Sequence, residues 1–259
     1  MVFTNLVQAN LSTKYLGRNI EYYSRLSSTN DEAWELVKES VSHGTIVITD
    51  NQFNGKGQYG NQWRSYPDKS LTFSIILNDL NQENMMPAII GVSVCKALKK
   101  FDFNVKLKWP NDLILEKKKV GGILCESKIL KNQRKTMVIG VGINVNETTN
   151  DILPELQASA TSLYSISNQS HQRERILAEI LNYIEKIILK KNENENFIIK
   201  EWEALCVHMN SNVSFHTNDK KINGKFLSLR SNGSALIMVG DSKKEFSSGI
   251  INIYEDVKP

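Results

Sequence analysis

The chain has 259 residues, of which 41% are hydrophobic and 23% are charged. A chain of this length can bury a large core, and this composition excludes an intrinsically disordered protein and a fibrous one. Its 32 Lys and Arg exceed its 28 Asp and Glu by four, and this excess is small and dispersed. The charge balance predicts no nucleic-acid partner and suits an enzyme that binds anionic ligands.

No targeting or membrane segment is predicted. Residues 1–15 lack a basic stretch followed by a long apolar one, so they do not resemble a signal peptide. The most apolar helical stretch, at 87–98, is too short to cross a bilayer. The three cysteines (Cys95, Cys125 and Cys206) are far apart, which argues against a disulfide framework or a zinc site. We therefore predict a cytoplasmic protein with no metal ligands of its own, although Mg²⁺ can arrive with a nucleotide.

The first half of the chain alternates strands with helices. Thr29, with Glu32 three residues later, is typical of a capping box that begins a helix ending near residue 41. A second helix is expected at 86–100. Strands are expected around these helices at 19–26, 44–50 and 71–77, and a glycine-rich loop at 51–65.

The next segment is a run of short strands separated by charged turns, at 105–109, 112–115, 120–128 and 136–145. This succession favours a mixed or antiparallel sheet over the regular alternation of a doubly wound fold. Helices follow at about 171–190 and 197–206. From about residue 211 the pattern changes to hairpins, with turns expected at 218–219, 223–224, 231–233 and 240–241, which predicts a small β module.

The loop from Gly55 to Gly60 has the pattern G-x-G-x-x-G. A dinucleotide-binding loop opens a helix, whereas this loop continues through Trp63 toward a strand, and no kinase HRD or DFG element follows. Glycines let backbone N–H groups approach an anion, and Lys56 adds positive charge. We therefore interpret the loop as an anion-binding element.

Three later segments also carry polar groups beside glycine or proline. In Lys108 to Asp112, Pro110 makes a rigid turn that presents an amide and a carboxylate to an adenine, a ribose or Mg²⁺, and a purely structural Asx-turn is an equal alternative. Lys119 precedes Gly121 and Gly122 and can reach a phosphoryl or carboxylate oxygen. The strand at 140–146 has two glycines, which indicate either a close approach of a ligand or tight core packing.

Taken in order, these segments resemble the catalytic module of biotin protein ligases: Ser28-Thr29-Asn30, Gln52 with GKGQYG and Trp63, KWPND, K-V-G-G-I-L and GVGINVN. Residues 160–163 (ATSL) also fit that family. The resemblance implies an α/β (α+β) fold in which helices flank a mixed sheet, followed by a small SH3-like β-barrel. Together with the change of pattern near residue 209, this divides the chain into a catalytic domain at 1–208 and a C-terminal module at 209–259.

The resemblance implies a two-step reaction with ATP, biotin and Mg²⁺. Biotin is first activated as biotinyl-5′-AMP, and it is then transferred to a lysine of the biotin carboxyl carrier protein domain of a carboxylase. This chemistry needs positioning and charge neutralisation and no enzyme nucleophile. No Ser/His/Asp or Cys/His constellation was found in the sequence, which agrees with this requirement.

The resemblance also assigns roles to residues. Lys119 would bridge the biotin carboxylate and the α-phosphate as the catalytic residue, with Asp112 in support. Trp63 would pack on the adenine. The other binding residues implied are Ser28, Thr29 and Gln52 for the ureido head of biotin, Gly55, Lys56, Gly57 and Gln58 in the loop, Asn111 and Asn144 for the nucleotide, and Asn30, Lys108, Trp109, Gly121 and Gly122 in the matching segments.

Two departures from the family pattern matter. Only about twenty residues precede the resemblance, so a DNA-binding winged helix and a repressor role are not expected. The family often has arginine at the position of Gln58, and a neutral amide there predicts a weaker hold on the adenylate. A lipoate protein ligase is the alternative enzyme, although its R-R-x-S-G-G-G motif is absent, and a non-catalytic sensor is the alternative from another class. The sequence leaves monomer and homodimer open.

Overall fold

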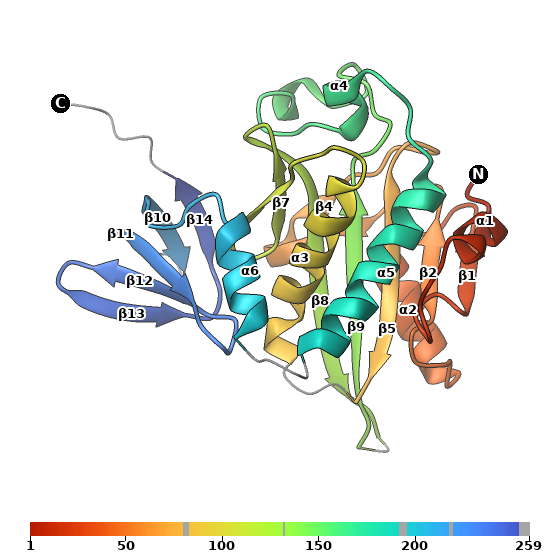
Figure 1. The fold of residues 1–259 in the computed structure, drawn as a ribbon, viewed down its shortest axis with the longest axis horizontal. Helices are drawn as coiled ribbons and strands as arrows, with labels where there is room; N and C mark the ends of the chain where they lie inside the picture. The colour runs from red at the N-terminus through yellow and green to blue at the C-terminus, as the bar shows by residue number, and fades with distance from the viewer. Residues whose placement is uncertain (80–82, 132, 192–195, 218–219, 254–259) are drawn as a thin grey trace.

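The computed structural model describes residues 1–79, 83–131, 133–191, 196–217 and 220–253. An α/β body built from the first two hundred residues or so lies beside a smaller C-terminal sheet (Figure 1). None of the helices in the described ranges combines the length and apolar character needed to cross a membrane.

The body is built on a seven-stranded sheet. Only its first two strands pair in parallel, and every other neighbouring pair is antiparallel, which confirms the predicted mixed sheet. In spatial order the strands are β1 (Ile20–Tyr23), β2 (Ile46–Thr49), β5 (Leu71–Asn78), β9 (Lys135–Ile143), β8 (Lys118–Ile129), β7 (Asp112–Leu115) and β6 (Lys106–Lys108).

The alternation of residues along β5 separates the two faces of this sheet. Phe73, Ile75 and Leu77 join the main core, which packs beneath α3 (Met86–Lys99) and α5 (Arg173–Lys191). Ile76 belongs to a second cluster, beneath α2 (Thr29–Lys38). Because successive side chains of a strand point to opposite faces, Thr72 and Ser74 lie on the α2 face. Figure 1 shows α3 and α5 covering the other face.

Most predicted elements occur within a few residues of their expected limits, and the differences have local causes. The N-cap of α2 is Ser28, one residue before the expected cap Thr29, and its Oγ accepts a hydrogen bond from the Asp31 amide. It ends at Lys38 and not near residue 41. The short helices α1 (Thr4–Ala9) and α4 (Leu163–Ser167) were not predicted, since neither is long enough to show helical periodicity. Helix α6 (Phe197–Leu205) matches its prediction.

The C-terminal module is a five-stranded antiparallel sheet in the order β13-β12-β11-β10-β14. Its strands are β10 (Asn212–Thr217), β11 (Lys220–Leu229), β12 (Ala235–Val239), β13 (Ser242–Phe246) and β14 (Ile250–Ile253). Among the described residues β13 and β14 do not pair with each other, so closure into an SH3-like barrel is not confirmed.

One predicted turn of this module is wrong. Asn223 and Gly224 lie inside β11, where a Cβ on Gly224 would stand 2.4 Å from the carbonyl oxygen of Met238 on β12. The glycine therefore permits close strand packing and does not mark a turn. The turns at 231–233 and 240–241 are present, and the one expected at 218–219 lies outside the described residues.

Candidate active site

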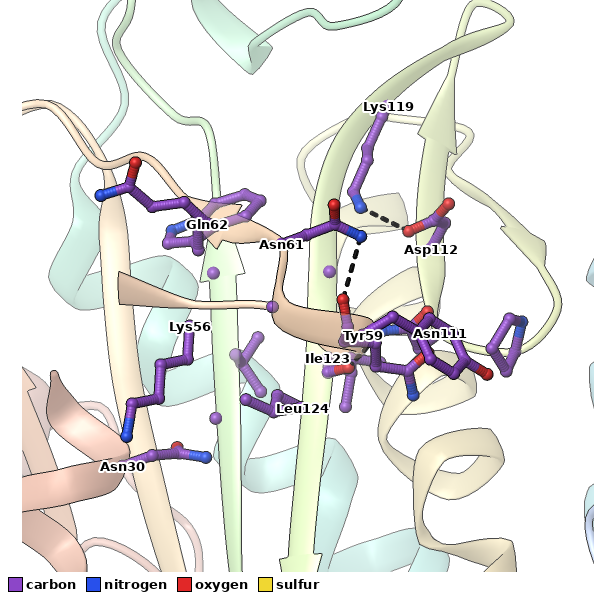
Figure 2. Close-up of a pocket in the computed structure, with 18 of the residues that line it drawn as sticks. Asn30, Lys56, Tyr59, Asn61, Gln62, Asn111, Asp112, Lys119, Ile123 and Leu124 are labelled. Carbon is purple, nitrogen blue, oxygen red and sulfur yellow. Dashed lines mark hydrogen bonds and ion pairs between the residues drawn. The ribbon is translucent and has the colours of Figure 1, made fainter. Parts of the chain in front are cut away.

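A cavity of about 170 Å³ lies on the α2 face of the sheet, and we call it the first cavity. A larger cavity of about 1150 Å³, the second cavity, adjoins it. Both are lined by Trp63, Lys108, Asp112 and Lys119, so these side chains stand at the boundary between the two spaces. Figure 2 shows a close-up of residues that line the first cavity.

The first cavity has a polar floor at the start of α2. Gln52 Oε1 accepts a hydrogen bond from the backbone amide of Thr29 at 2.8 Å, and the Thr29 hydroxyl lies 3.2 Å from the same oxygen. Ser74, on the neighbouring β5, places its hydroxyl 2.7 Å from Thr29 Oγ1. These side chains are buried, so their remaining hydrogen-bonding capacity faces the cavity or one another.

Asn30 is held from two sides. Its Oδ1 accepts from the Ser74 hydroxyl at 2.6 Å, and its Nδ2 donates to Glu126 Oε2 at 2.7 Å. A Cβ on Gly140 would lie 2.4 Å from Asn30 Oδ1, so only glycine permits this approach. Asn30 is therefore fixed by β5, β8 and β9, and it depends on Glu126, which the sequence analysis did not include among the site residues.

Lys119 and Asp112 form an ion pair at the boundary between the cavities. Their Nζ and Oδ1 atoms are 2.5 Å apart, and the side chains of Lys119 and Asp112 are 42% and 19% exposed (Figure 2). Lys108 Nζ lies 3.7 Å from the other carboxylate oxygen. The β7–β8 hairpin brings the pair together, because its strands place Asp112 opposite Gly122 and Lys119 opposite Ile114.

Backbone contacts hold both predicted nucleotide-binding asparagines in place. Asn111 exchanges two hydrogen bonds with Ile123: its Nδ2 donates to the Ile123 carbonyl at 2.6 Å, and its own carbonyl accepts from the Ile123 amide. Asn144 Nδ2 donates to the Thr161 carbonyl at 2.9 Å, and Asn144 lines the second cavity only. The ATSL segment therefore packs beside Lys119, whose carbonyl accepts from the Thr161 amide.

Trp63 lies at the boundary between the two cavities, and its indole N–H is a buried hydrogen-bond donor. Its indole lies against Gly142, where a Cβ would approach a ring carbon to 2.4 Å. Within the described residues, Trp63 Nε1 has no hydrogen-bond partner, and neither has the hydroxyl of Thr72, which also lines the first cavity. Buried polar atoms are usually satisfied, so a ligand is the expected partner of these two groups.

The glycine loop folds into a small hairpin over the cavity. Strands β3 (Gly55–Lys56) and β4 (Gln62–Trp63) pair, and a 3₁₀ turn (η1, Gln58–Gly60) joins them. Lys56 Nζ contacts Asp31 Oδ1 at 2.5 Å, so it points toward the start of α2 and away from Lys119 (Figure 2). Gly55 is required because a Cβ there would stand 2.5 Å from the Trp63 carbonyl oxygen.

The structure thus brings nearly all of the predicted site residues to the two cavities. All lie in the described part of the chain, and the two exceptions, Gly55 and Gly121, lie behind the cavity walls as close-packing positions. Other lining residues were not predicted: Tyr59, which lies within the GKGQYG loop, and Thr72, Gly249, Ile250 and Ile251, which belong to no motif. The last three come from the C-terminal sheet, and only the folded chain brings them here.

Trp109 connects the site to that sheet. It is buried, its indole Nε1 donates to the Gly233 carbonyl at 3.2 Å, and its ring centroid is 5.9 Å from that of Phe215. The KWPND turn therefore lines the first cavity, and it also holds the C-terminal sheet beside that cavity.

The residues at the cavities do not form a Mg²⁺ site by themselves. Within the described residues there is no group of three His, Cys, Asp or Glu side chains able to hold a metal ion. Asp112 is the single carboxylate among the described residues that line the first cavity, and lysines contact both of its oxygens. Mg²⁺ often binds through substrate phosphates, and such an ion would enter with the nucleotide as part of the substrate.

Comparison with known proteins identifies the family. The model of the Biotin/lipoate A/B protein ligase family matches residues 22–144. The chain is 28% identical to the bifunctional ligase/repressor BirA of Bacillus subtilis over 95% of this chain and 78% of that protein. It is 24% identical to the biotin–[acetyl-CoA-carboxylase] ligase of Mycobacterium tuberculosis, over 76% of this chain and 74% of that one.

A solved structure is similar to this chain in both fold and sequence. The biotin protein ligase of Aquifex aeolicus, crystallised with biotin and ATP, superposes with a TM-score of 0.76 and is 31% identical. The match covers 92% of this chain and 99% of the Aquifex chain. With this coverage, and with the motif residues gathered around two adjoining cavities, the chain belongs to the biotin protein ligase family.

Proposed function

We propose that this protein activates biotin with ATP and transfers it to a lysine of a carrier protein. The observation that carries the proposal is that Lys119 lines both cavities. In the proposed arrangement biotin occupies the first cavity and ATP the second. The carboxylate of one substrate then meets the α-phosphate of the other beside the Lys119 ammonium.

The walls of the first cavity support biotin as its occupant. Leu124 supplies apolar surface for a thiophane ring and a valeryl chain, because its position on β8, opposite Gly140, puts its side chain on the α2 face of the sheet. The polar floor formed by Thr29 and Gln52 supplies donors and acceptors for a ureido group, which has both kinds of atom. A ligand with a purely apolar head would leave the remaining hydrogen-bonding capacity of these buried groups unsatisfied, which is costly.

In the first step, a carboxylate oxygen of biotin attacks the α-phosphorus of ATP. A bond from this oxygen to phosphorus forms while the bond to the pyrophosphate oxygen breaks, which leaves biotinyl-5′-AMP. The Lys119 ammonium is positioned to offset negative charge on the reacting oxygens, and Asp112 holds it in place at 2.5 Å. Charge stabilisation by a fixed group requires no reorganisation as the reaction proceeds.

In the second step, an amine of the acceptor lysine attacks the activated carbonyl. A carbon–nitrogen bond forms, the carbonyl–oxygen bond to AMP breaks, and the amine loses a proton. We propose the biotin carboxyl carrier protein domain of a carboxylase as the acceptor, since the Mycobacterium tuberculosis relative is named as a ligase of acetyl-CoA carboxylase. Residues 1–208 would carry the chemistry, and residues 209–259 would form the C-terminal module that borders the first cavity.

Biotin-dependent exchange of labelled pyrophosphate into ATP tests substrate and chemistry together. We expect exchange with biotin and none with lipoate, because lipoate lacks a ureido group. The second step is tested by adding a carrier domain and the same domain with its acceptor lysine replaced by arginine, and only the first should be labelled. Exchange that is independent of biotin, or supported equally by lipoate, would refute the proposal.

A further inference from the structure

The glycine loop contains a non-glycine residue in a conformation that favours glycine. Tyr59 has φ +56° and ψ +35°, in the left-handed region, although it carries an aromatic side chain that is 55% exposed. Residues other than glycine, asparagine and aspartate seldom adopt this backbone conformation. Where they do, contacts with the surrounding structure hold them in it. The contacts of Tyr59 should therefore explain why the loop is built in this way.

The Tyr59 hydroxyl contacts the C-terminal sheet 190 positions away in the chain. Its oxygen accepts a hydrogen bond from the Gly249 amide at 2.6 Å and lies 3.4 Å from the Gly249 carbonyl oxygen. Gly249 has a left-handed φ of +145°, and a Cβ there would lie 2.2 Å from the Phe215 ring. Position 249 therefore accepts only glycine, and it presents its backbone amide to the loop from just before β14.

The C-terminal sheet is itself fixed to the body of the site. Trp109 donates to Gly233 and packs against Phe215, the same ring that confines Gly249. The Tyr59–Gly249 contact thus ties one side of the glycine loop to a part of the molecule that is anchored independently. Tyr59 and Gly249 both line the first cavity, and Figure 2 shows Tyr59 among its lining residues.

From this geometry we infer that Tyr59 is a latch: its hydroxyl holds the glycine loop closed against Gly249 while the activated intermediate lies beneath the loop. This inference rests on the proposed function for the identity of that intermediate. Opening the loop breaks the Tyr59–Gly249 hydrogen bond, so the C-terminal sheet sets how long the cavity stays closed. Tyr59 acts through the loop and is a positioning residue.

The test uses Tyr59→Phe, which removes one hydroxyl and keeps the ring. In the ligand-free protein we expect faster hydrogen exchange at the Gly249 amide and faster tryptic cleavage after Lys56, each by about two- to tenfold, the range for one lost hydrogen bond. Biotinyl-AMP should dissociate faster by a similar factor. Tyr183→Phe, on α5 away from both cavities, is the matched control and should match the wild type in every measurement.

Two results would overturn the latch. One is an unchanged exchange rate at Gly249 in Tyr59→Phe, which would mean that the hydrogen bond does not form in solution. The other is faster exchange with unchanged loop cleavage, which would mean that the bond does not hold the loop. Both measurements need no substrate, so they decide the latch even if the wild type forms no biotinyl-AMP and the proposed function fails.

Discussion

The β7–β8 hairpin positions Lys119, and the Asp112 carboxylate orients its side chain. The β7–β8 hairpin brings Lys119 to Asp112, and their charged atoms are 2.5 Å apart at the boundary between the cavities. The neighbouring Lys118 points elsewhere and donates to the Gln157 carbonyl at 2.7 Å. Two adjacent lysines therefore have different partners, and this difference makes a sharp test possible.

Lys119→Ala is expected to slow formation of biotinyl-AMP by at least about 10²-fold, the usual effect of removing one charge-stabilising group. Biotin affinity should change much less, because the charge is needed mainly where negative charge develops in the transition state. Rapid-quench measurement of the adenylate and calorimetry with biotin would check both. A larger loss of rate in Lys118→Ala than in Lys119→Ala would show that the catalytic lysine has been misassigned.

Gln58→Arg is expected to lengthen retention of the adenylate. Gln58 lines the first cavity within the loop, and its side chain is uncharged. An arginine in its place would donate charge-assisted hydrogen bonds to the phosphate, which we expect to slow adenylate dissociation about fivefold. The measurement is adenylate release, together with labelling of bystander proteins in the absence of acceptor. Equal release rates in the two forms would mean that the loop holds its anion through backbone amides alone.

Between elements, the buried carboxylic acid Glu147 lies in the segment that follows β9, and its side chain contacts Ser70 directly before β5. The Glu147 side chain is fully buried; its Oε1 accepts from the Ser70 hydroxyl at 2.5 Å, and the Glu147 carbonyl accepts from Ser162. Among the described residues, its Oε2 has no partner. Burial, partly opposed by the Ser70 hydrogen bond, raises the pKa of Glu147 to about 7 from its usual 4.5.

This shift predicts a loss of stability as the pH rises. Between pH ~4.5 and ~7 the folded protein keeps a proton on Glu147 that the unfolded chain has released, so the free energy of unfolding falls with rising pH. Glu147→Gln should remove this dependence and be more stable than the wild type by about 1–2 kcal/mol at about pH 8. Urea denaturation at about pH 5 and about pH 8 measures both. Parallel pH profiles for the two proteins would show that Glu147 does not titrate in this range.

At the scale of the whole molecule, a neutral histidine lies where the body meets the C-terminal sheet. His208 is fully buried between Trp202 of α6 and Phe226 of β11, with ring centroids 6.1 and 4.4 Å away. Neither ring nitrogen has a hydrogen-bond partner within the described ranges. Burial, with a smaller contribution from Lys108, lowers the pKa of His208 to about 3. Protonation of His208 in the folded state is therefore opposed by its surroundings.

This junction should be weakened by acid. The unfolded chain binds a proton at His208 below pH ~6.5 and the folded chain does not, so the stabilisation is complete above that pH and is lost as the pH falls toward ~3. We expect a loss of about 2 kcal/mol by about pH 5, which His208→Leu, a similar volume without a titratable group, should abolish. His216→Gln, at an exposed position of the same sheet, is the control. An unaltered acid slope in His208→Leu would exclude this residue as the cause.

Sequence reasoning reached the mixed sheet, most of the helices and the motif residues because these depend on local patterns. Short apolar runs bounded by turns, glycines beside polar groups and the rigid Pro110 turn are all properties of short segments. A prediction was wrong where the same short sequence fits two structures, a turn and a closely packed strand. Asn223-Gly224 is a strong turn signal locally, and only the contact with Met238 shows that the glycine serves strand packing.

The sequence by itself determined which chemical groups are available and the order in which they stand along the chain, and this was enough to identify the family resemblance. Only the tertiary structure decided that Lys119 pairs with Asp112 and Lys56 with Asp31, and that Gly249 contacts Tyr59. It also decided that the Thr72 hydroxyl is buried with no hydrogen-bond partner among the residues that the structure describes. The physical reason is distance along the chain. Contacts within a strand or a turn leave a periodic trace, whereas a contact across 190 residues forms only when separately folded surfaces pack, and it leaves no pattern in either segment.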